Sequence, residues 1–415
     1  MAKMAKTSPT RKAVKLDRKK HGRVACLAAE MVAAPMGAQP PTLGSKTRIW
    51  KQDPSVDIGI RDVYVHTSVQ EGPKDSQIEI KGLPVVLPGI AGDFLFEPSS
   101  EEAFDAVHTY TVVRQALTMY QRALNERLKW QWNTGGNSEP LSVFPHAGET
   151  ANAFYSRNEK ALKFFFFRPD GAPPDSPFVH TCRSFDIVAH EFGHAILDSF
   201  QPGWLSFSSP PQTGGLHESF GDITSVLLVL SQLDQVEYII AESKADLHQK
   251  TILSDVAEQF GAELLDRSNG LRNADNNLKL SDVSNQVHDI SQVFTGGFYD
   301  VLADAFTASR DPRNTDDAIV LHSVGQKMAV LVLTAVKAAP AQNATFADVA
   351  NEMIKVAQAA PDEYPNYDVF IENQFTLRQV LGPDAVAGPA AGPGFAPSMA
   401  GCCGTMQHLE LEAQR

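Results

Sequence analysis

The segment Ser184-Phe-Asp-Ile-Val-Ala-His-Glu-Phe-Gly-His-Ala-Ile-Leu-Asp198 contains the pattern H-E-x-x-H, in which His190 and His194 flank Glu191. Its apolar residues recur at helical spacing, which predicts a helix over 185–200. Residues four apart lie on one helical face, so two imidazoles can hold one metal ion with a carboxylate beside it. Ionisable groups inside an apolar helix are costly to bury unless a metal or another partner satisfies them. The stretch is therefore interpreted as a metal site.

A third metal ligand is expected downstream, because a catalytic zinc ion usually takes three protein ligands and a water. The segment Gly214–Ile223 supplies Glu218 on a second expected helix, and Asp222 follows one turn later. Asp222 is thereby placed to hold the outer nitrogen of a ligand imidazole. His217 is expected on the helical face away from Glu218, as a solvated or core-edge histidine. Glu218 thus joins the two histidines as a candidate zinc ligand.

The composition is that of a soluble globular protein. The chain has 415 residues, of which 43% are hydrophobic and 20% charged, so it has room for two lobes. No apolar run approaches about 18 residues, and no transmembrane segment is expected. No convincing signal peptide is found either, because Glu30 interrupts the apolar stretch 24–29. Localisation stays open, with the cytoplasm favoured over secretion, and nothing indicates the oligomeric state.

Charge is distributed unevenly along the chain. Residues 1–24 carry a net charge of +8, which leaves −21 of the total of −13 on the remainder. An acidic body argues against nucleic acid as a substrate, because the phosphate backbone would be repelled. The basic start is expected to be a disordered extension, and contact with an anionic surface is the alternative.

The cysteines do not indicate a disulfide framework. Cys26, Cys182, Cys402 and Cys403 are too few and too unevenly spaced for one. The adjacent pair near the C-terminus is interpreted as plain thiols, because no further Cys or His spacing supports a second zinc. His108 and His146 receive no role.

Periodicity predicts an α+β fold with a β-rich N-terminal lobe and a mainly helical C-terminal lobe. The expected domains are a disordered extension 1–46, a β-rich lobe 47–184, a helical lobe 185–382 and a low-complexity tail 383–415. The expected helices are 101–130, 185–200, 216–245, 288–307, 320–338, 345–358 and 373–381. The helix with the two histidines would lie at the junction of the lobes, where a cleft could take a substrate.

These motifs resemble those of the thermolysin-like (M4-type, gluzincin) neutral zinc metallopeptidases. Residues 186–198 match the family pattern D-V-V-A-H-E-x-x-H-A-V-x-D, and 215–223 match a sequence like G-A-x-N-E-A-x-S-D-I. Asn152-Ala153-Phe154-Tyr155 resembles the family segment N-A-F-W. Residues 287–299 resemble V-H-x-x-S-G-V-x-N-x-A-F-Y, and 270–272 resemble a short motif that ends in arginine. The similarity covers roughly 95–382.

The resemblance implies a thermolysin-like two-lobe zincin fold and a metalloendopeptidase acting on peptides or proteins. Its catalytic ion would be one Zn2+, with Glu191 as the base that activates the zinc-bound water. His288 would stabilise the transition state. The residues implied for substrate binding are Asn152, Ala153, Arg272, Ile187 and Leu271. The last two would line the S1′ pocket, which implies a bulky apolar P1′ residue.

The chain departs from the family pattern in two places. A tyrosine that normally assists at the oxyanion is missing between Ala195 and His217, and the nearest counterparts by position are Phe207 and Trp204. Calcium is doubtful, because the glutamate expected after Glu218 is replaced by Val229 and the six to eight oxygen ligands that calcium prefers are not found. Asp186 does match a calcium-binding aspartate of the family.

Two alternatives stay open. The chain could be a zincin-fold binding module that retains zinc but has weak or no catalytic activity, which the missing tyrosine motivates. It could also be a zinc hydrolase that acts on a non-peptide amide or ester.

Overall fold

The computed structural model describes residues 44–56, 58–169, 171–206, 208–256, 272–386 and 405. These residues form one compact unit of helices and strands. Residues 1–43 of the predicted extension lie outside the described residues. The predicted tail also lies outside them beyond residue 386, apart from Thr405. The division into lobes at residue 184 stays a prediction.

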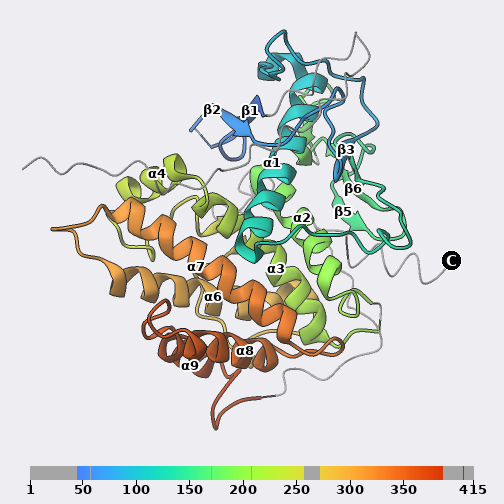
Figure 1. Ribbon diagram of the computed structural model, residues 1–415. Helices are drawn as coiled ribbons and strands as arrows, with labels where there is room; N and C mark the ends of the chain where they lie inside the picture. Colours follow the sequence, from blue (N-terminus) through green and yellow to red (C-terminus); the bar gives the residue numbers. More distant parts are fainter. Residues whose placement is uncertain are drawn as a thin grey trace, which may run out of the picture. The chain divides into compact units, whose positions relative to one another are not determined.

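Most of the described strands lie before residue 185, where strand-like sequence was predicted (Figure 1). A four-stranded sheet has the order β3-β4-β6-β5, in which β5 is an antiparallel edge strand and the other pairs are parallel. Two-stranded pairs form from β1 with β2 and from β7 with β8. The strand bounds are β1 Ser45–Trp50, β2 Ile60–Val65, β3 Ile78–Ile80, β4 Leu141–Phe144, β5 Ala153–Ser156, β6 Ala161–Phe164, β7 Phe166–Phe167 and β8 Val179–His180.

The first long helix, α1 (Glu101–Leu124), follows the short 3-10 turn η1 (Pro98–Ser100). It ends six residues before the predicted end at residue 130. The reason is local, because Asn125 adopts a left-handed conformation with φ of 50°, which terminates a helix. The helix is buried over most of its length and packs against α2 and β1.

The predicted helix 185–200 is confirmed as α2 (Phe185–Phe200). It follows the 3-10 turn η2 (Thr181–Arg183), and the Ser184 side chain caps it by accepting a hydrogen bond from the Ile187 amide. Every residue from Phe185 to Asp198 is buried. The helix lies between α1 and α3 in the middle of the described unit (Figure 1).

The predicted single helix over 216–245 is wrong. The chain forms α3 (Pro211–Leu230) and α4 (Leu233–Ser243), which meet at an angle of 93°. Gln232 between them has an extended backbone, which breaks the helical hydrogen bonding. Two glycines let α2 and α3 approach closely, since a Cβ on Gly193 would lie 2.9 Å from the Gly221 Cα.

The remaining helices pack around α3, with α6 against it and α7, α8 and α9 outside (Figure 1). The predicted helices 288–307, 320–338 and 345–358 are confirmed within a few residues as α6, α7 and α8. The predicted helix 373–381 is displaced, because α9 begins six residues before 373 and ends four before 381. The bounds are β9 Asp255–Val256, β10 Arg272–Asn273, α6 Val287–Ser309, α7 Asp317–Ala338, α8 Phe346–Ala359 and α9 Tyr367–Leu377.

Among the described residues, α7 alone is long and apolar enough to cross a membrane by length and composition. The bent pair of α3 and α4 passes the same test if it is taken as one span. Helices in the core of a protein have the same composition, and 56% of the apolar window in α7 is buried against the rest of the chain.

Candidate active site

The three candidate ligands converge from two helices. His190 and His194 project from α2 and Glu218 projects from α3. The two Nε2 atoms lie 3.2 Å apart, and the Glu218 carboxylate lies 3.5 Å from His190 Nε2 and 3.8 Å from His194 Nε2. All three side chains are buried, with at most 3% of each exposed.

This donor set fits a metal ion. Two imidazole nitrogens and one carboxylate, all facing each other, are the ligands of many catalytic zinc sites. Burial alone would raise the pKa of Glu218, but His288, His194 and the hydrogen bond from His190 hold it well below its usual range. The group is therefore an anionic carboxylate in a buried site, where a bound cation would balance its charge.

Glu191 lies on the same helix as the two histidines and is completely buried. Ligand atoms of His190, Glu191 and His194 fall within 4.8 Å of one another. A carboxylate at this position can exchange a proton with a molecule bound between the helices.

The outer side of His190 is held by an ion pair. His190 Nδ1 lies 2.9 Å from Asp222 Oδ1, and Arg272 Nη2 donates to the same oxygen at 2.7 Å. Burial lowers the pKa of His190, but the bonds to Asp222 and Glu218 outweigh it and raise the pKa to about 9. Asp222 thus lies beside the outer nitrogen of His190, and its role behind a metal ligand stays a prediction.

His217 does not lie where the sequence predicted. It is fully buried, and its Nδ1 lies 2.7 Å from His194 Nδ1. Burial lowers the pKa of His217 to about 3, so the ring is neutral near pH 7 and its Nδ1 can accept a hydrogen bond from His194 Nδ1–H. The prediction failed because α3 is buried on all sides, so that both faces of the helix contact other groups.

His288 lies in the first turn of α6 and reaches the same centre. Its Nε2 is 3.2 Å from Glu218 Oε2, and its Nδ1 is 2.8 Å from the Gln286 side chain. About 13% of the His288 side chain is exposed, more than of any of the three candidate ligands. The imidazole therefore stands at the rim of the buried cluster.

The predicted substrate-binding residues are only partly brought together. Asn152 and Ala153 stand at the start of the edge strand β5, where the Asn152 side chain accepts a hydrogen bond from the Ala153 amide. Arg272 contacts Asp222 and is 9% exposed. Ile187 is buried in α2, and Leu271 lies outside the described residues.

Trp204, one suggested counterpart of the missing tyrosine, does not replace it. Trp204 is completely buried and donates its indole N–H to the Pro340 carbonyl, and Phe207 lies outside the described residues. At the position matched to a calcium ligand, Asp186 accepts a hydrogen bond from the Gln52 side chain at 2.9 Å. Val229 is buried in the core.

Thr405 also belongs to this site, although nothing in the sequence indicated it. Its hydroxyl donates to Glu191 Oε2 at 2.9 Å and accepts from the Tyr155 amide of β5 at 2.8 Å. The residue is completely buried. A threonine in a segment after a run of Ala, Gly and Pro has no periodic pattern or motif by which it could be found.

A cavity lies away from these residues. It has a volume of about 660 Å3 and is lined by residues of β2, α1 and α7, among them Val65, His66, Arg122 and His322. None of the predicted site residues lines it. We attach the function to the side-chain cluster, since chemistry follows from the groups present and not from volume.

Comparison with known proteins adds little. No protein-family model matches the chain, and no curated protein matches it. Among solved structures it is similar to the precursor of protealysin, a metalloproteinase from Serratia proteamaculans, with 18% identity and a TM-score of 0.42. The match covers 66% of this chain and 77% of that one. At this TM-score the likeness carries no conclusion about function.

Proposed function

We propose that this protein is a zinc-dependent metalloendopeptidase in which Glu191 activates the attacking water. One observation carries the proposal. The imidazoles of His190 and His194 and the carboxylate of Glu218 face each other in a buried site, and Glu191 lies on the helix of the two histidines. The resemblance of the motifs to thermolysin-like peptidases supports it.

His190, His194 and Glu218 would hold the metal. When bound, zinc would polarise the scissile carbonyl and lower the pKa of a water in the fourth position. The chain orients the two histidines from behind. Asp222 contacts the outer nitrogen of one ring and His217 that of the other, which fixes their tautomers so that both Nε2 atoms face the site.

The proton transfers fall to Glu191. Its buried carboxylate accepts a proton from the attacking water and delivers it to the departing amine. His288, at the rim of the cluster, is proposed to donate a hydrogen bond to the oxyanion of the substrate. A single such donor typically lowers the barrier by about 3 kcal/mol. Because the family tyrosine is missing, this donor would act without its usual companion.

The substrate strand is proposed to lie along β5. That strand is the edge of the four-stranded sheet, and an edge offers backbone groups to an extended peptide. Thr405 already uses one of them, the Tyr155 amide. Ile187 and Leu271 would favour a bulky apolar P1′ residue, as in the similar family.

The test is cleavage of casein and of a furylacryloyl dipeptide by the full-length chain, with and without phenanthroline, alongside its metal content. We expect chelator-sensitive cleavage and about one zinc per chain bound by the three ligands. Glu191→Gln should abolish turnover and keep that zinc. Glu237→Gln, which changes an exposed glutamate on α4, is the matched control.

Other outcomes discriminate against the proposal. Retained zinc without cleavage of any peptide would indicate the binding module. Chelator-sensitive cleavage of esters or non-peptide amides alone would indicate the second alternative. Cleavage by Glu191→Gln at the rate of the unchanged protein would show that another group is the base.

A further inference from the structure

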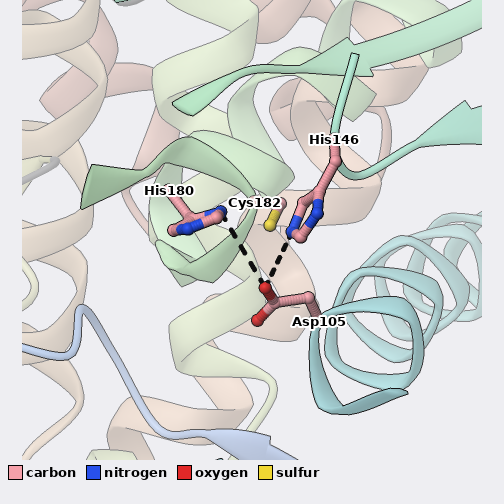
Figure 2. Close-up of side chains that lie close together, drawn as sticks. All are labelled: Asp105, His146, His180 and Cys182. Carbon is pink, nitrogen blue, oxygen red and sulfur yellow. Dashed lines mark hydrogen bonds and ion pairs between the residues drawn. The ribbon is translucent and has the colours of Figure 1, made fainter. Parts of the chain in front are cut away.

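A second cluster of metal-ligating side chains lies outside the site described above. It consists of Asp105 in α1, His146 just after β4, His180 at the end of β8 and Cys182 in η2. One ligand atom from each lies within 4.8 Å of the others. Figure 2 shows the two imidazoles, the thiol and the carboxylate turned toward one another.

The distances centre on one carboxylate oxygen. His146 Nε2 lies 2.9 Å from Asp105 Oδ2, and His180 Nδ1 lies 3.9 Å from the same atom. The two imidazole rings are 4.7 Å apart between centroids. Asp105 and Cys182 are completely buried, whereas 15% and 14% of the two histidine side chains are exposed. The cluster is therefore buried on one side and open to solvent on the other.

We propose that Asp105, His146, His180 and Cys182 form a second, structural zinc site. Two nitrogens, one sulfur and one oxygen suit a borderline-soft divalent ion, whereas calcium and magnesium prefer oxygen alone. Four protein ligands leave no open position, which is the pattern of a structural site. Neighbouring ligand atoms of tetrahedral zinc stand roughly 3.5 Å apart. The ligand atoms here lie within 4.8 Å of one another, so a bound ion would draw the more distant ones together and lengthen the 2.9 Å contact between His146 and Asp105.

The geometry around His180 supports this assignment. Its Nδ1 is buried and makes no hydrogen bond within the described part of the chain. A buried ring nitrogen that points at a carboxylate oxygen without reaching it is in place for an ion between them.

Arg183 is the competing partner of Asp105. Its Nε donates to Oδ1 at 2.7 Å and its Nη2 to Oδ2 at 2.9 Å. The pair leaves Asp105 as a carboxylate whose Oδ2 is shared with the histidines, and Arg183 can keep Oδ1 when a metal takes Oδ2. Such outer contacts commonly orient a carboxylate ligand. The alternative is an ion-pair network without metal, and titration with Co2+ distinguishes it from a metal site.

The position of the cluster explains what a metal would do there. Cys182 stands in η2, which leads directly into α2, the helix of His190 and His194. Asp105 stands on α1, which packs against both η2 and α2. A metal held by these residues would tie the start of the active-site helix to α1 and to the loop after β4. It would stabilise the site without taking part in the chemistry.

The test uses the full-length chain with Cys26→Ser, Cys402→Ser and Cys403→Ser, which keeps Cys182 as its sole thiol. The metal-free protein is titrated with Co2+, because a bound thiolate gives a near-ultraviolet charge-transfer band that nitrogen and oxygen ligands do not. We expect the band to saturate at about one Co2+ per chain at this site. Adding Cys182→Ser should remove it and lower the total metal content by one equivalent.

A second variant guards against misfolding of the buried Cys182→Ser. His180→Gln changes a partly exposed ligand and should lower the affinity for Co2+, measured from the titration of the band, by about tenfold or more. His66→Gln, at an exposed histidine outside the cluster, should leave it unchanged. If the single-thiol protein gives no band with excess Co2+, the cluster is an ion-pair network only and the proposal is overturned. Peptide cleavage is not used in any of these measurements, so they stand whether or not the proposed peptidase activity is found.

Discussion

The hydroxyl of Thr405 bridges the Glu191 carboxylate and the Tyr155 amide, with distances of 2.9 and 2.8 Å. The two partners are the proposed base and a backbone donor of the proposed substrate strand. The chain thus places one of its own side chains, 214 residues away in sequence, where a substrate or the attacking water would contact Glu191.

Thr405→Val should therefore raise peptidase activity. The substitution keeps the size of the side chain and removes both hydrogen bonds, one of them to a charged group worth about 1.5–3 kcal/mol. If Thr405 competes with substrate, the rate at low substrate concentration should rise by roughly tenfold or more. Thr405→Ser keeps the hydroxyl and should behave like the unchanged chain. Equal rates for all three proteins would show that the contact does not limit catalysis.

Gly221 of α3 lies directly against the ring of His190 of α2. A Cβ at this position would lie 2.6 Å from His190 Cε1 and Nδ1. Gly221→Ala should push the ring off Asp222 and lower zinc affinity by roughly 10- to 100-fold, as loss of such outer contacts does. Competition with a fluorescent chelator measures the affinity.

The control for that variant is Gly215→Ala on the same helix. There the new Cβ would meet Ile290 and Phe346 of the core at 2.8 and 3.0 Å, and not a ligand. We expect lower stability with zinc affinity retained. Equal losses of affinity in both variants would mean that overall destabilisation, and not the position of His190, controls binding.

His217 should act as a positioning residue for His194. It is the acceptor beside His194 Nδ1, at 2.7 Å. His217→Leu removes the acceptor and should lower zinc affinity by roughly 10-fold or more, whereas His217→Asn offers an amide oxygen and should restore most of it. Isothermal titration with zinc measures both. If the two variants bind alike, the contact does not orient the ligand.

His108 should make the protein sensitive to acid. It is completely buried in α1 and accepts a hydrogen bond from the Trp50 amide at 3.2 Å. Burial lowers the pKa of His108 to about 3, against about 6.5 in an unfolded chain. Between these values the unfolded chain binds a proton that the folded chain does not, so this contribution to stability falls as the pH falls.

The expected slope is about 1.4 kcal/mol per pH unit between roughly pH 6 and pH 4. His108→Asn keeps an acceptor for Trp50 and has no titrating group, so its unfolding free energy in urea should fall less steeply with acid by about that amount. Above about pH 7 the two proteins should differ by a constant offset. Parallel curves throughout the acid range would contradict the prediction.

The local part of the site could be predicted because helix geometry is local. The i, i+4 spacing of His190 and His194 puts both on one face of α2 whatever surrounds it. The capping serine and the apolar spacing likewise define where the helix begins. The end of α1 was missed for the opposite reason: the left-handed turn at Asn125 leaves no trace in apolar periodicity.

The environment of His217 could not be predicted from local sequence. Its helical face was predicted, but whether that face meets solvent or His194 depends on how α3 packs. Burial on all sides of a helix is a property of the whole core, which a single segment does not encode.

The sequence by itself determined the helix that carries His190, Glu191 and His194, because helix formation and side-chain spacing depend on contacts within a few residues. Glu218 could be named as a candidate ligand from the motif that contains it. Only the tertiary structure decided that Asp105 meets His146, 41 residues away, and that Thr405 meets Glu191. Such encounters are fixed by the burial of many side chains at once, since no local preference is strong enough to overcome the entropy of a long loop.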